Sequence, residues 1–327
     1  MRRTAIIPLI AVAALAGAKS NQPPGCPRQI SFSACPVQCP GPIDGERKFD
    51  MSKSPVVGVA GCGSMGLPMA QALQHAGYEV WGLDVRPASE FGSFQSRMLE
   101  DPAEFASRVQ VVISVVRDVT QSRELCFDRQ ALFTRAQYPG TLIVSSTLSP
   151  RFMPELRSRL PVDVTLIDAP MSGAPHAARL RKLSFMLGGP DDALDRLTPL
   201  FQAMGQHVFR LGPLGAGMTA KVLNNYVASA SVVAVRRAYA RARELGADLE
   251  ALRSVMKASS GSTWFGDHFH DIDWSREGYE ANNTIGILEK DIRSGLDAMC
   301  GAERAEPDAF DAALLAAIRA IEPFELP

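Results

Sequence analysis

Short apolar runs alternate with helical patterns between residues 55 and 212. The first run, VVGVA at residues 56–60, is rich in β-branched side chains and leads into a glycine-rich segment. Comparable apolar runs occupy residues 109–116, 140–147, 164–170, 183–187 and 207–211. Runs of this length, separated by amphipathic stretches, are typical of buried strands joined by helices. The pattern predicts a mostly parallel, doubly wound α/β sheet, in which the last short strands can be antiparallel.

From residue 214 onward the pattern favours helices only. Residues 214–245 contain no proline and many good helix formers, and Gly246 ends this stretch. No strong strand run follows, and helical patterns continue to about Ile321. The sequence therefore predicts an α/β domain over residues 55–212 and an all-α domain over residues 213–327, joined by a long helix. A small ligand is then expected between the two domains.

A glycine turn directly follows the first strand run. Its glycines have the spacing G-x-G-x-x-G, and a helix-period stretch ending at Gly77 comes next. The first glycine permits a tight turn, the second lets the backbone approach a pyrophosphate, and the third lets the helix close on the strand. The helix N-terminus also offers free N–H groups to phosphates. The residues expected to bind a dinucleotide here are Gly61, Gly63, Ser64, Met65 and Gly66.

Asp84 ends the second predicted strand, 18 residues after Gly66. Its carboxylate can accept hydrogen bonds from both hydroxyls of a ribose. A lone G-x-G-x-x-G also occurs in turns that bind nothing. Its placement between a strand and a helix, with an acid after the next strand, favours a Rossmann-type dinucleotide domain.

Lys221 and Asn225 form the first candidate catalytic pair. They are four residues apart near the start of the long predicted helix, so they share one face. Near a helix N-terminus and a cationic nicotinamide, the charged form of a lysine is disfavoured. Such a lysine can take or give a hydroxyl proton. Taken alone, a Lys/Asn pair on a helix is usually solvated surface.

A candidate carboxylate-binding loop follows the run at residues 164–170. Ser172 with the backbone amides of Gly173 and Ala174 forms a small nest of donors at the carboxyl end of a strand. The simpler interpretation is an ordinary turn after a strand. Further along, Glu289-Lys290-Asp291 is either a surface charge cluster or a place from which Lys290 reaches the cofactor or a carboxylate. His268 and His270 favour a polar loop over a metal site, and we expect no metal.

Charge, cysteines and the N-terminus narrow the function classes. A net charge of −1 gives no electrostatic case for nucleic acid or an anionic membrane as a partner. The arginine-rich run from Arg236 to Arg243 predicts a solvated face or a subunit contact. The three cysteines after Met51 have no metal or disulfide spacing, which favours reduced thiols and a cytoplasmic protein.

Residues 1–54 read as a leader or an extension without a core-forming pattern. Arg2-Arg3 before the apolar run 5–18 resembles a secretory signal, too short to span a membrane, and an organelle transit segment is also conceivable. The favoured interpretation is a native start at Met51, immediately before the first strand. An enzyme of pyridine nucleotides needs the cofactor pool of a cell, which argues against export.

Taken together, these segments resemble the β-hydroxyacid dehydrogenase family, which is related to 6-phosphogluconate dehydrogenase. The matching features occur in family order: GCGSMGLPMAQAL from Gly61, Ser146-Thr147 with Pro150, DAPMSG from Asp168, GAGMTAKVLNN from Gly215, and Lys290-Asp291. The resemblance covers the chain from Val56 to its end. It implies hydride transfer between NAD and a small 3-hydroxy acid, of the 3-hydroxyisobutyrate, tartronate semialdehyde or threonate kind.

The resemblance also implies a role for each matching residue. Lys221 is the general acid/base, and Asn225 orients the substrate. Ser172 and Gly173, with Ala174 beside them, hold the substrate carboxylate. Thr147 lies beside the nicotinamide, and Lys290 lies near cofactor and substrate. A homodimer or homotetramer is expected.

Asp84 favours NAD over NADP because a carboxylate repels a 2′-phosphate, although Arg86 leaves room for NADP. The chain departs from the family at Ala174 and Arg181, where glycines are usual, and at Ser145, where an acid is common. Two alternatives remain open: an imine reductase, which usually lacks the lysine, and a non-catalytic NAD(P)-binding interaction protein.

Overall fold

The computed structural model describes residues 54–300 and 307–325 of the 327-residue chain. These described residues form one compact unit. The predicted leader, residues 1–54, lies outside the described residues except for its last position. Within the described ranges, none of the helices is both long and apolar enough to cross a membrane.

Eight strands form one sheet with the order β2-β1-β3-β4-β5-β7-β6, and β8 pairs with β7. Strands β1 to β5 are all parallel, β7 runs antiparallel to β5, and β8 runs parallel to β7. This confirms the mostly parallel α/β sheet. The strands are β1 (Val57–Ala60), β2 (Val80–Leu83), β3 (Val111–Ser114), β4 (Thr141–Val144), β5 (Thr165–Asp168), β6 (Met171–Ser172), β7 (Leu183–Gly188) and β8 (Gly205–Gly212).

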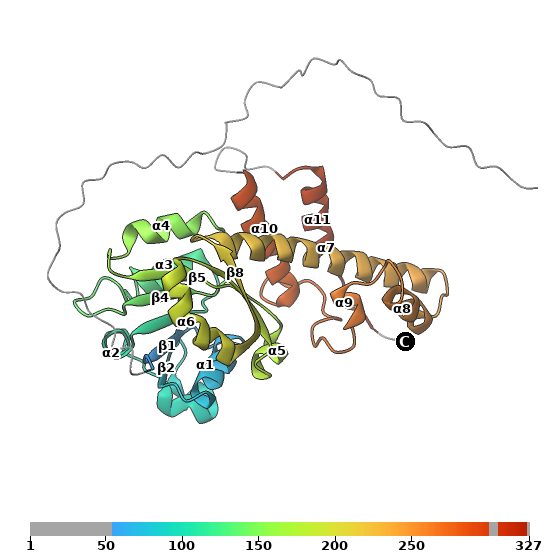
Figure 1. Ribbon diagram of the computed structural model, residues 1–327. Helices are drawn as coiled ribbons and strands as arrows, with labels where there is room; N and C mark the ends of the chain where they lie inside the picture. The colour runs from blue at the N-terminus through green and yellow to red at the C-terminus, as the bar shows by residue number, and fades with distance from the viewer. Residues whose placement is uncertain (1–53, 301–306, 326–327) are drawn as a thin grey trace, which may run out of the picture. The chain divides into compact units, whose positions relative to one another are not determined.

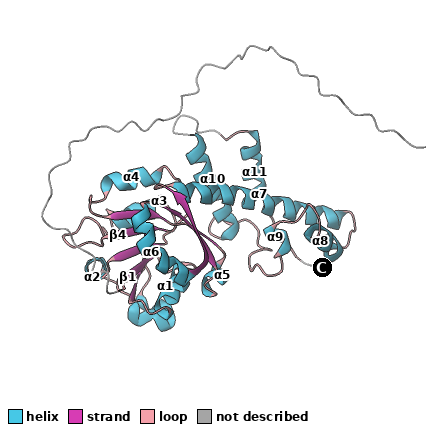
Figure 2. Cartoon of the chain, viewed as in Figure 1, coloured by secondary structure: helices cyan, strands magenta, loops and turns pink. Residues whose placement is uncertain are grey.

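Helices cover both faces of the sheet, as Figures 1 and 2 show. On one face, Met69 of α1 (Gly66–His75) and Phe201 of α6 (Asp191–Met204) share a core with the strands. On the other face, the core includes residues of α2 (Pro102–Arg108), α3 (Val119–Cys126) and α4 (Phe152–Arg159). A 3₁₀ segment, η1 (Ala88–Arg97), and the short helix α5 (Pro175–Arg179) complete this part. Strands β1 to β5 are buried along nearly their whole length, which explains their continuous apolar runs, whereas β8 is largely exposed.

A single helix of 29 residues, α7 (Ala216–Glu244), leads from the sheet into the helical part. Gly246 follows it with a φ of +65°, the left-handed conformation that closes many helices. The remaining helices are α8 (Leu249–Lys257), α9 (Trp264–Asp267), α10 (Thr284–Cys300) and α11 (Ala309–Arg319). Their core with α7 is built from residues such as Val232, Phe269 and Ile292.

Three local expectations are wrong or sharpened. The amphipathic pattern at residues 123–133 favours a helix there, whereas the structure places α3 at Val119–Cys126, because Asp118 caps its start and the chain turns after Cys126. Arg236 is not on a solvated face. Its guanidinium is buried and donates to the carbonyl oxygens of Ser275, at 2.6 Å, and of Glu277 and Glu322. Burial lowers the pKa of Arg236 to about 10.

Arg181 is exposed and has a φ of +57°, a conformation in which glycine is unstrained.

Candidate active site

The glycine turn has the geometry that a dinucleotide requires. Gly61 has a φ of +89°, and a side chain at Gly66 would place Cβ only 2.0 Å from the carbonyl oxygen of Gly61. At Gly63, by contrast, an added Cβ would meet nothing within 4 Å. Helix α1 starts without a side-chain cap. The amide of Leu67 donates to the carbonyl oxygen of Gly63 at 3.1 Å and Pro68 has no N–H, so the donors for phosphate oxygens are the amides of the glycine turn at the helix start. The turn therefore fits a pyrophosphate that approaches at Gly63.

The Asp84 carboxylate contacts this turn and already accepts hydrogen bonds from the protein itself. Its Oδ2 accepts from the amide of Cys62 at 2.8 Å, and its Oδ1 accepts from Nε of Arg86 at 3.1 Å. Nη2 of Arg86 also donates to the carbonyl oxygen of Cys62 at 3.0 Å. The guanidinium thus bridges the carboxylate and the turn. Sequence reasoning placed these two residues near each other but did not foresee that Arg86 partly neutralises Asp84.

A cavity of about 200 Å³ opens beside Asp84. It is lined by Leu83, Asp84, Val85, Glu100, Pro102, Arg129 and Gln130. Asp84 and Val85 follow β2, at the carboxyl edge of the parallel strands, where doubly wound sheets bind ligands. The cavity therefore lies next to the expected ribose position and offers space to the adenosine half of a dinucleotide.

Lys221 lies on the second turn of α7 and is only 6% exposed. Burial lowers the pKa of its amine to about 8, opposed by the charge of Asp291 and aided by that of Lys290. No hydrogen bond joins its ammonium to another described residue. A buried lysine with a pKa near 8 is neutral far more often around pH 7 to 8 than an exposed lysine, and it can therefore exchange a proton with a substrate hydroxyl.

Asp291 on α10 organises the residues around this lysine. Its Oδ2 accepts from Nδ2 of Asn225 at 2.5 Å, and its Oδ1 forms an ion pair with Nζ of Lys290 at 2.8 Å. The same Lys290 ammonium donates to the carbonyl oxygen of Thr147 at 2.7 Å. Thr147 follows β4, so this bond connects α10 to the carboxyl edge of the sheet. Asn225, Asp291, Lys290 and Thr147 are thereby linked, and the charges of Asp291 and Lys290 act on Lys221.

Asp291 is the main residue that sequence reasoning missed as a member of the site. The Lys290-Asp291 pair was noticed, but only Lys290 was assigned a role. The sequence contained an indication of this role. Asp291 is adjacent to Lys290, and a carboxylate accepts hydrogen bonds from amide and ammonium groups. Glu289, the remaining charged residue of this run, has a different set of partners. It accepts from Tyr279 at 2.6 Å, Arg293 at 2.8 Å and Arg319 at 2.6 Å.

The contacts of Glu289 are structural. Its hydrogen bond with Arg319, together with those from Tyr279 and Arg293, lowers the pKa of this buried carboxyl to about 2. Arg319 belongs to α11, so the carboxylate joins α10 to α11. The interpretation of residues 289–291 as a plain surface cluster is therefore wrong, because Glu289 and Asp291 are both buried.

The predicted carboxylate loop is present, but the described contacts do not connect it to Lys221. Gly173 has a φ of +124°, and the Ser172 hydroxyl makes no hydrogen bond to another described residue. Helix α5, which follows the loop, lies against α1, the helix of the glycine turn. The carboxylate role of Ser172, Gly173 and Ala174 stays a prediction.

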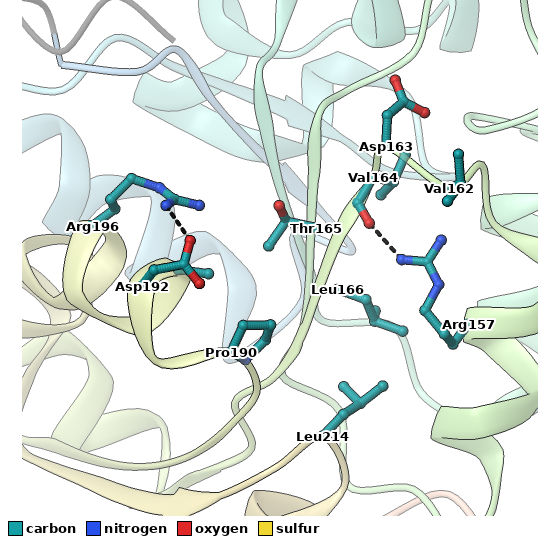
Figure 3. Close-up of a pocket in the computed structure, with 11 residues that line it drawn as sticks. Arg157, Val162, Asp163, Val164, Thr165, Leu166, Pro190, Asp192, Arg196 and Leu214 are labelled. Carbon is teal, nitrogen blue, oxygen red and sulfur yellow. Dashed lines mark hydrogen bonds and ion pairs between the residues drawn. The ribbon is translucent and has the colours of Figure 1, made fainter. Parts of the chain in front are cut away.

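A larger pocket of about 320 Å³ lies elsewhere (Figure 3). Its walls come from the start of β5 and the start of α6, and it contains none of the expected site residues. Its arginines are engaged with their own chain: Arg157 donates to Val164 O at 2.5 Å, and Arg196 to Asp192 at 2.6 Å. Because this pocket contains none of the expected residues, we assign the candidate active site to the surroundings of Lys221. Among residues 54–300 and 307–325, no group of three or more His, Cys, Asp or Glu could hold a metal ion.

Two family models match consecutive parts of the chain. Residues 56–212 match the model of the NAD binding domain of 6-phosphogluconate dehydrogenase. Residues 215–316 match the NAD-binding domain of NADP-dependent 3-hydroxyisobutyrate dehydrogenase. The first match contains the glycine turn and Thr147, and the second contains Lys221, Asn225 and Lys290. The two matches meet between Gly212 and Gly215, where β8 ends and α7 begins.

Individual relatives and structures are similar over most of their length. The mitochondrial 3-hydroxyisobutyrate dehydrogenase of Homo sapiens is 30% identical over 250 residues, which cover 74% of each chain. The L-threonate dehydrogenase of Cupriavidus necator is 31% identical over 247 residues, covering 74% of this chain and 82% of that protein. A crystal structure of 3-hydroxyisobutyrate dehydrogenase from Salmonella typhimurium superimposes with a TM-score of 0.68 at 27% identity, covering 81% of this chain and 93% of that one.

Proposed function

Because the chain belongs to the β-hydroxyacid dehydrogenase family, we propose that it oxidises a short 3-hydroxy acid with NAD(P), using Lys221 as the general acid/base. The observation that carries this proposal is the buried amine of Lys221, with its pKa lowered to about 8, within a network of Asp291, Asn225 and Lys290. A surface lysine has no such environment. The family assignment supports an oxidoreductase, and the lysine supports a hydroxyl as the reacting group.

The residues divide the work of the reaction. The bound nicotinamide supplies the hydride chemistry. Lys221, when neutral, accepts the hydroxyl proton as the carbonyl forms, and it returns a proton in the reverse direction. Asn225 is held by Asp291 through its Nδ2, and its Oδ1 accepts from Nδ2 of Asn224 at 3.1 Å, so one acceptor position of that oxygen is left to orient the substrate or the lysine. The amides of Gly173 and Ala174, with the Ser172 hydroxyl, are donors suited to the substrate carboxylate.

A panel of hydroxy acids tests the proposed activity. The panel contains 3-hydroxyisobutyrate, L-threonate and L-serine, each with NAD and NADP, and a cyclic imine for the reductase alternative. We expect oxidation of at least one hydroxy acid, monitored as NAD(P)H absorbance. A protein that binds NAD yet oxidises no member of the panel, or that reduces only the imine, would contradict the proposal.

The Asp84–Arg86 pair predicts the cofactor preference. We expect the wild type to favour NAD because the Asp84 carboxylate repels a 2′-phosphate, and Arg86 to moderate this preference. Asp84→Ser should raise kcat/KM with NADP relative to NAD by about tenfold, the equivalent of about 1.4 kcal/mol. Arg86→Ala should change the ratio in the opposite direction. Steady-state kinetics with both cofactors measure it.

Arg97→Ala is the control for this pair, because Arg97 lies over the Trp81 ring on the neighbouring segment and does not contact Asp84. It should leave the ratio unchanged. If Asp84→Ser also leaves the ratio unchanged, Asp84 does not face the ribose.

Assembly and compartment are further parts of the proposal. A homodimer or homotetramer is supported by apolar side chains that are exposed in the single chain: Leu223 and Val227 on α7, and Phe310 on α11, with 49%, 66% and 61% exposed. Light scattering measures the assembly directly. A cytoplasmic location is proposed because the reaction needs a cellular pool of pyridine nucleotide.

A further inference from the structure

Asp168, the last residue of β5, ends in a carboxylate that none of the proposed chemistry uses. The residue is fully buried. Its Oδ1 accepts from the amide of Gly215 at 2.7 Å, and its Oδ2 accepts from the amide of Met218 at 2.7 Å. Gly215 is the N-cap of α7, and Met218 is the third residue of that helix. The carboxylate therefore lies at the very start of α7.

These two bonds replace a cap that α7 lacks in its own sequence. A helix start is usually stabilised by the side chain of its N-cap residue, which accepts from amides two or three positions later. Gly215 has no side chain, and α7 has no side-chain cap of its own. Asp168 supplies the missing acceptor from a strand 47 residues earlier. A carboxylate is also favoured at this positive end of the helix.

The surroundings leave the carboxylate and the helix start little freedom. A Cβ at Gly188 would lie 2.4 Å from Oδ1 of Asp168. A Cβ at Gly217 would lie 2.2 Å from the carbonyl oxygen of Met186 and 2.9 Å from Oδ2 of Asp168. The first turn of α7 is thus in close contact with β7 and bonded to Asp168 of β5, the strand paired with β7. The close contacts at Gly188 and Gly217 leave little room for this turn to shift.

The same helix carries the proposed acid/base. Lys221 follows Met218 by three residues, which is about 4.5 Å along the helix axis, and Asn225 follows one turn later. The burial that lowers the pKa of Lys221 depends on where this turn lies relative to α10, which provides Asp291 and Lys290. A displacement of the helix start therefore changes both the direction and the burial of the amine.

We infer that Asp168 is a positioning residue: its carboxylate fixes the start of α7 on the sheet and so sets the place of Lys221 relative to Asp291 and the cofactor. This inference rests on the proposed role of Lys221. Asp168 is a positioning residue and not a catalytic one, because it acts only through the two amides of α7. Burial raises the pKa of Asp168 to about 6, so the carboxylate is ionised at the neutral and alkaline pH values where Lys221 works.

The test compares Asp168→Asn with Asp248→Asn. Asparagine keeps the shape of Asp168 but turns an NH₂ group towards one of the two amides. Asp248 is a matched control, because it caps α8 by accepting from the amides of Glu250, at 2.9 Å, and Ala251, at 3.1 Å, away from Lys221. We expect Asp168→Asn to lower kcat on the order of 10- to 100-fold, the scale of a small misplacement of a catalytic group. NAD affinity by calorimetry should change less than about twofold, and Asp248→Asn should leave kcat at the wild-type value.

A second readout follows Lys221 without using activity. The pH dependence of reductive methylation, resolved at Lys221 by mass spectrometry, reports the pKa of its amine. In Asp168→Asn we expect this pKa to rise from about 8 towards 10.5, because the lysine becomes less buried while Asp291 and Lys290 are unchanged. If both turnover and the Lys221 titration match the wild type, the inference is overturned.

The two readouts separate failure of this inference from failure of the proposed function. A wild type that oxidises no hydroxy acid removes the proposed function, while the titration still reports whether Asp168 sets the environment of Lys221. An active wild type, with an Asp168→Asn variant that matches it in both turnover and the Lys221 titration, removes only the inference. Should the variant not fold, amide hydrogen exchange of the wild type decides. The Gly215 and Met218 amides should then exchange as slowly as those of the sheet core, and exchange as fast as at Glu250 and Ala251 of α8 would overturn the inference.

Discussion

Lys221→Met is expected to remove hydride-transfer activity and, at the same time, to make the protein more stable at pH 7. Loss of a general acid/base costs on the order of 10²- to 10⁴-fold in turnover. NAD affinity should change little, because Lys221 contacts neither the glycine turn nor Asp84. Initial rates with a substrate from the panel and NAD calorimetry measure these two effects.

The gain in stability follows from the lowered pKa. The fold holds the pKa of Lys221 at about 8, against 10.5 for a free lysine. Each pKa unit corresponds to about 1.4 kcal/mol, so burying the charged amine costs about 3 kcal/mol. Below pH 8 the lysine is charged in both states, and the cost is fully present. Between pH 8 and 10.5 the unfolded chain binds the extra proton, so the stability of the wild type rises with pH.

The stability difference between Lys221→Met and the wild type should therefore be largest below pH 8, decrease between pH 8 and 10.5, and be smallest above pH 10.5. Chemical denaturation at several pH values measures it. Lys257→Met is the control, because Lys257 lies exposed on α8, and it should change neither activity nor stability appreciably. A Lys221→Met protein that is less stable than the wild type at pH 7 would show that the amine is not buried in charged form.

The same pKa predicts the pH profile of the wild type. In the oxidative direction Lys221 must be neutral, so kcat/KM should fall as pH drops below about 8. In the reductive direction the lysine must be protonated, so kcat/KM should fall as pH rises above this value. An inflection that persists in Lys221→Met would assign the titration to another group.

Gly63→Ala is expected to weaken NAD binding by about 10- to 100-fold while leaving the free protein as stable as the wild type. An added Cβ at Gly63 meets no protein atom within 4 Å, so the fold tolerates it. The space it fills is the approach of the pyrophosphate to the backbone. Calorimetry of NAD binding and thermal unfolding without cofactor measure the two effects separately.

Gly66→Ala is the informative partner of this variant. Its Cβ would lie 2.0 Å from the Gly61 carbonyl oxygen, so it should lose both stability and NAD affinity. Gly77→Ala, at the other end of α1, is the control. Its φ of +91° makes alanine strained, so we expect a stability loss of about 1 kcal/mol with unchanged affinity. If Gly63→Ala binds NAD like the wild type, the pyrophosphate does not approach this turn.

Local patterns carry much of the fold and part of the site. Apolar runs of four to six residues and the glycine spacing are properties of neighbouring positions, and they predicted the parallel sheet, the dinucleotide turn and the long helix α7. The four-residue spacing of Lys221 and Asn225 likewise placed both on one helix face. The role of Ser172, Gly173 and Ala174 stays a prediction, since no described contact connects their loop to this face.

Burial and long-range pairing, in contrast, depend on which segments meet in space. Nothing near Arg236 in the sequence indicates that its guanidinium binds carbonyl oxygens some 40 and 86 residues away. The pairing of Asn225 with Asp291 spans 66 residues, and that of Lys290 with Thr147 spans 143. In the sequence, Asp168 is only the first residue of the DAPMSG segment. In the structure, its carboxylate accepts hydrogen bonds from two amides at the start of α7.

The sequence by itself thus determined which elements form, and it predicted where a dinucleotide approaches the backbone and which lysine takes part in proton transfer. Only the tertiary structure decided that this lysine is buried, that Asp291 faces it, and that Arg86 covers Asp84. The physical reason is that periodicity and turn chemistry are set by adjacent residues, whereas the pKa of an amine is set by desolvation and by charges brought from distant segments.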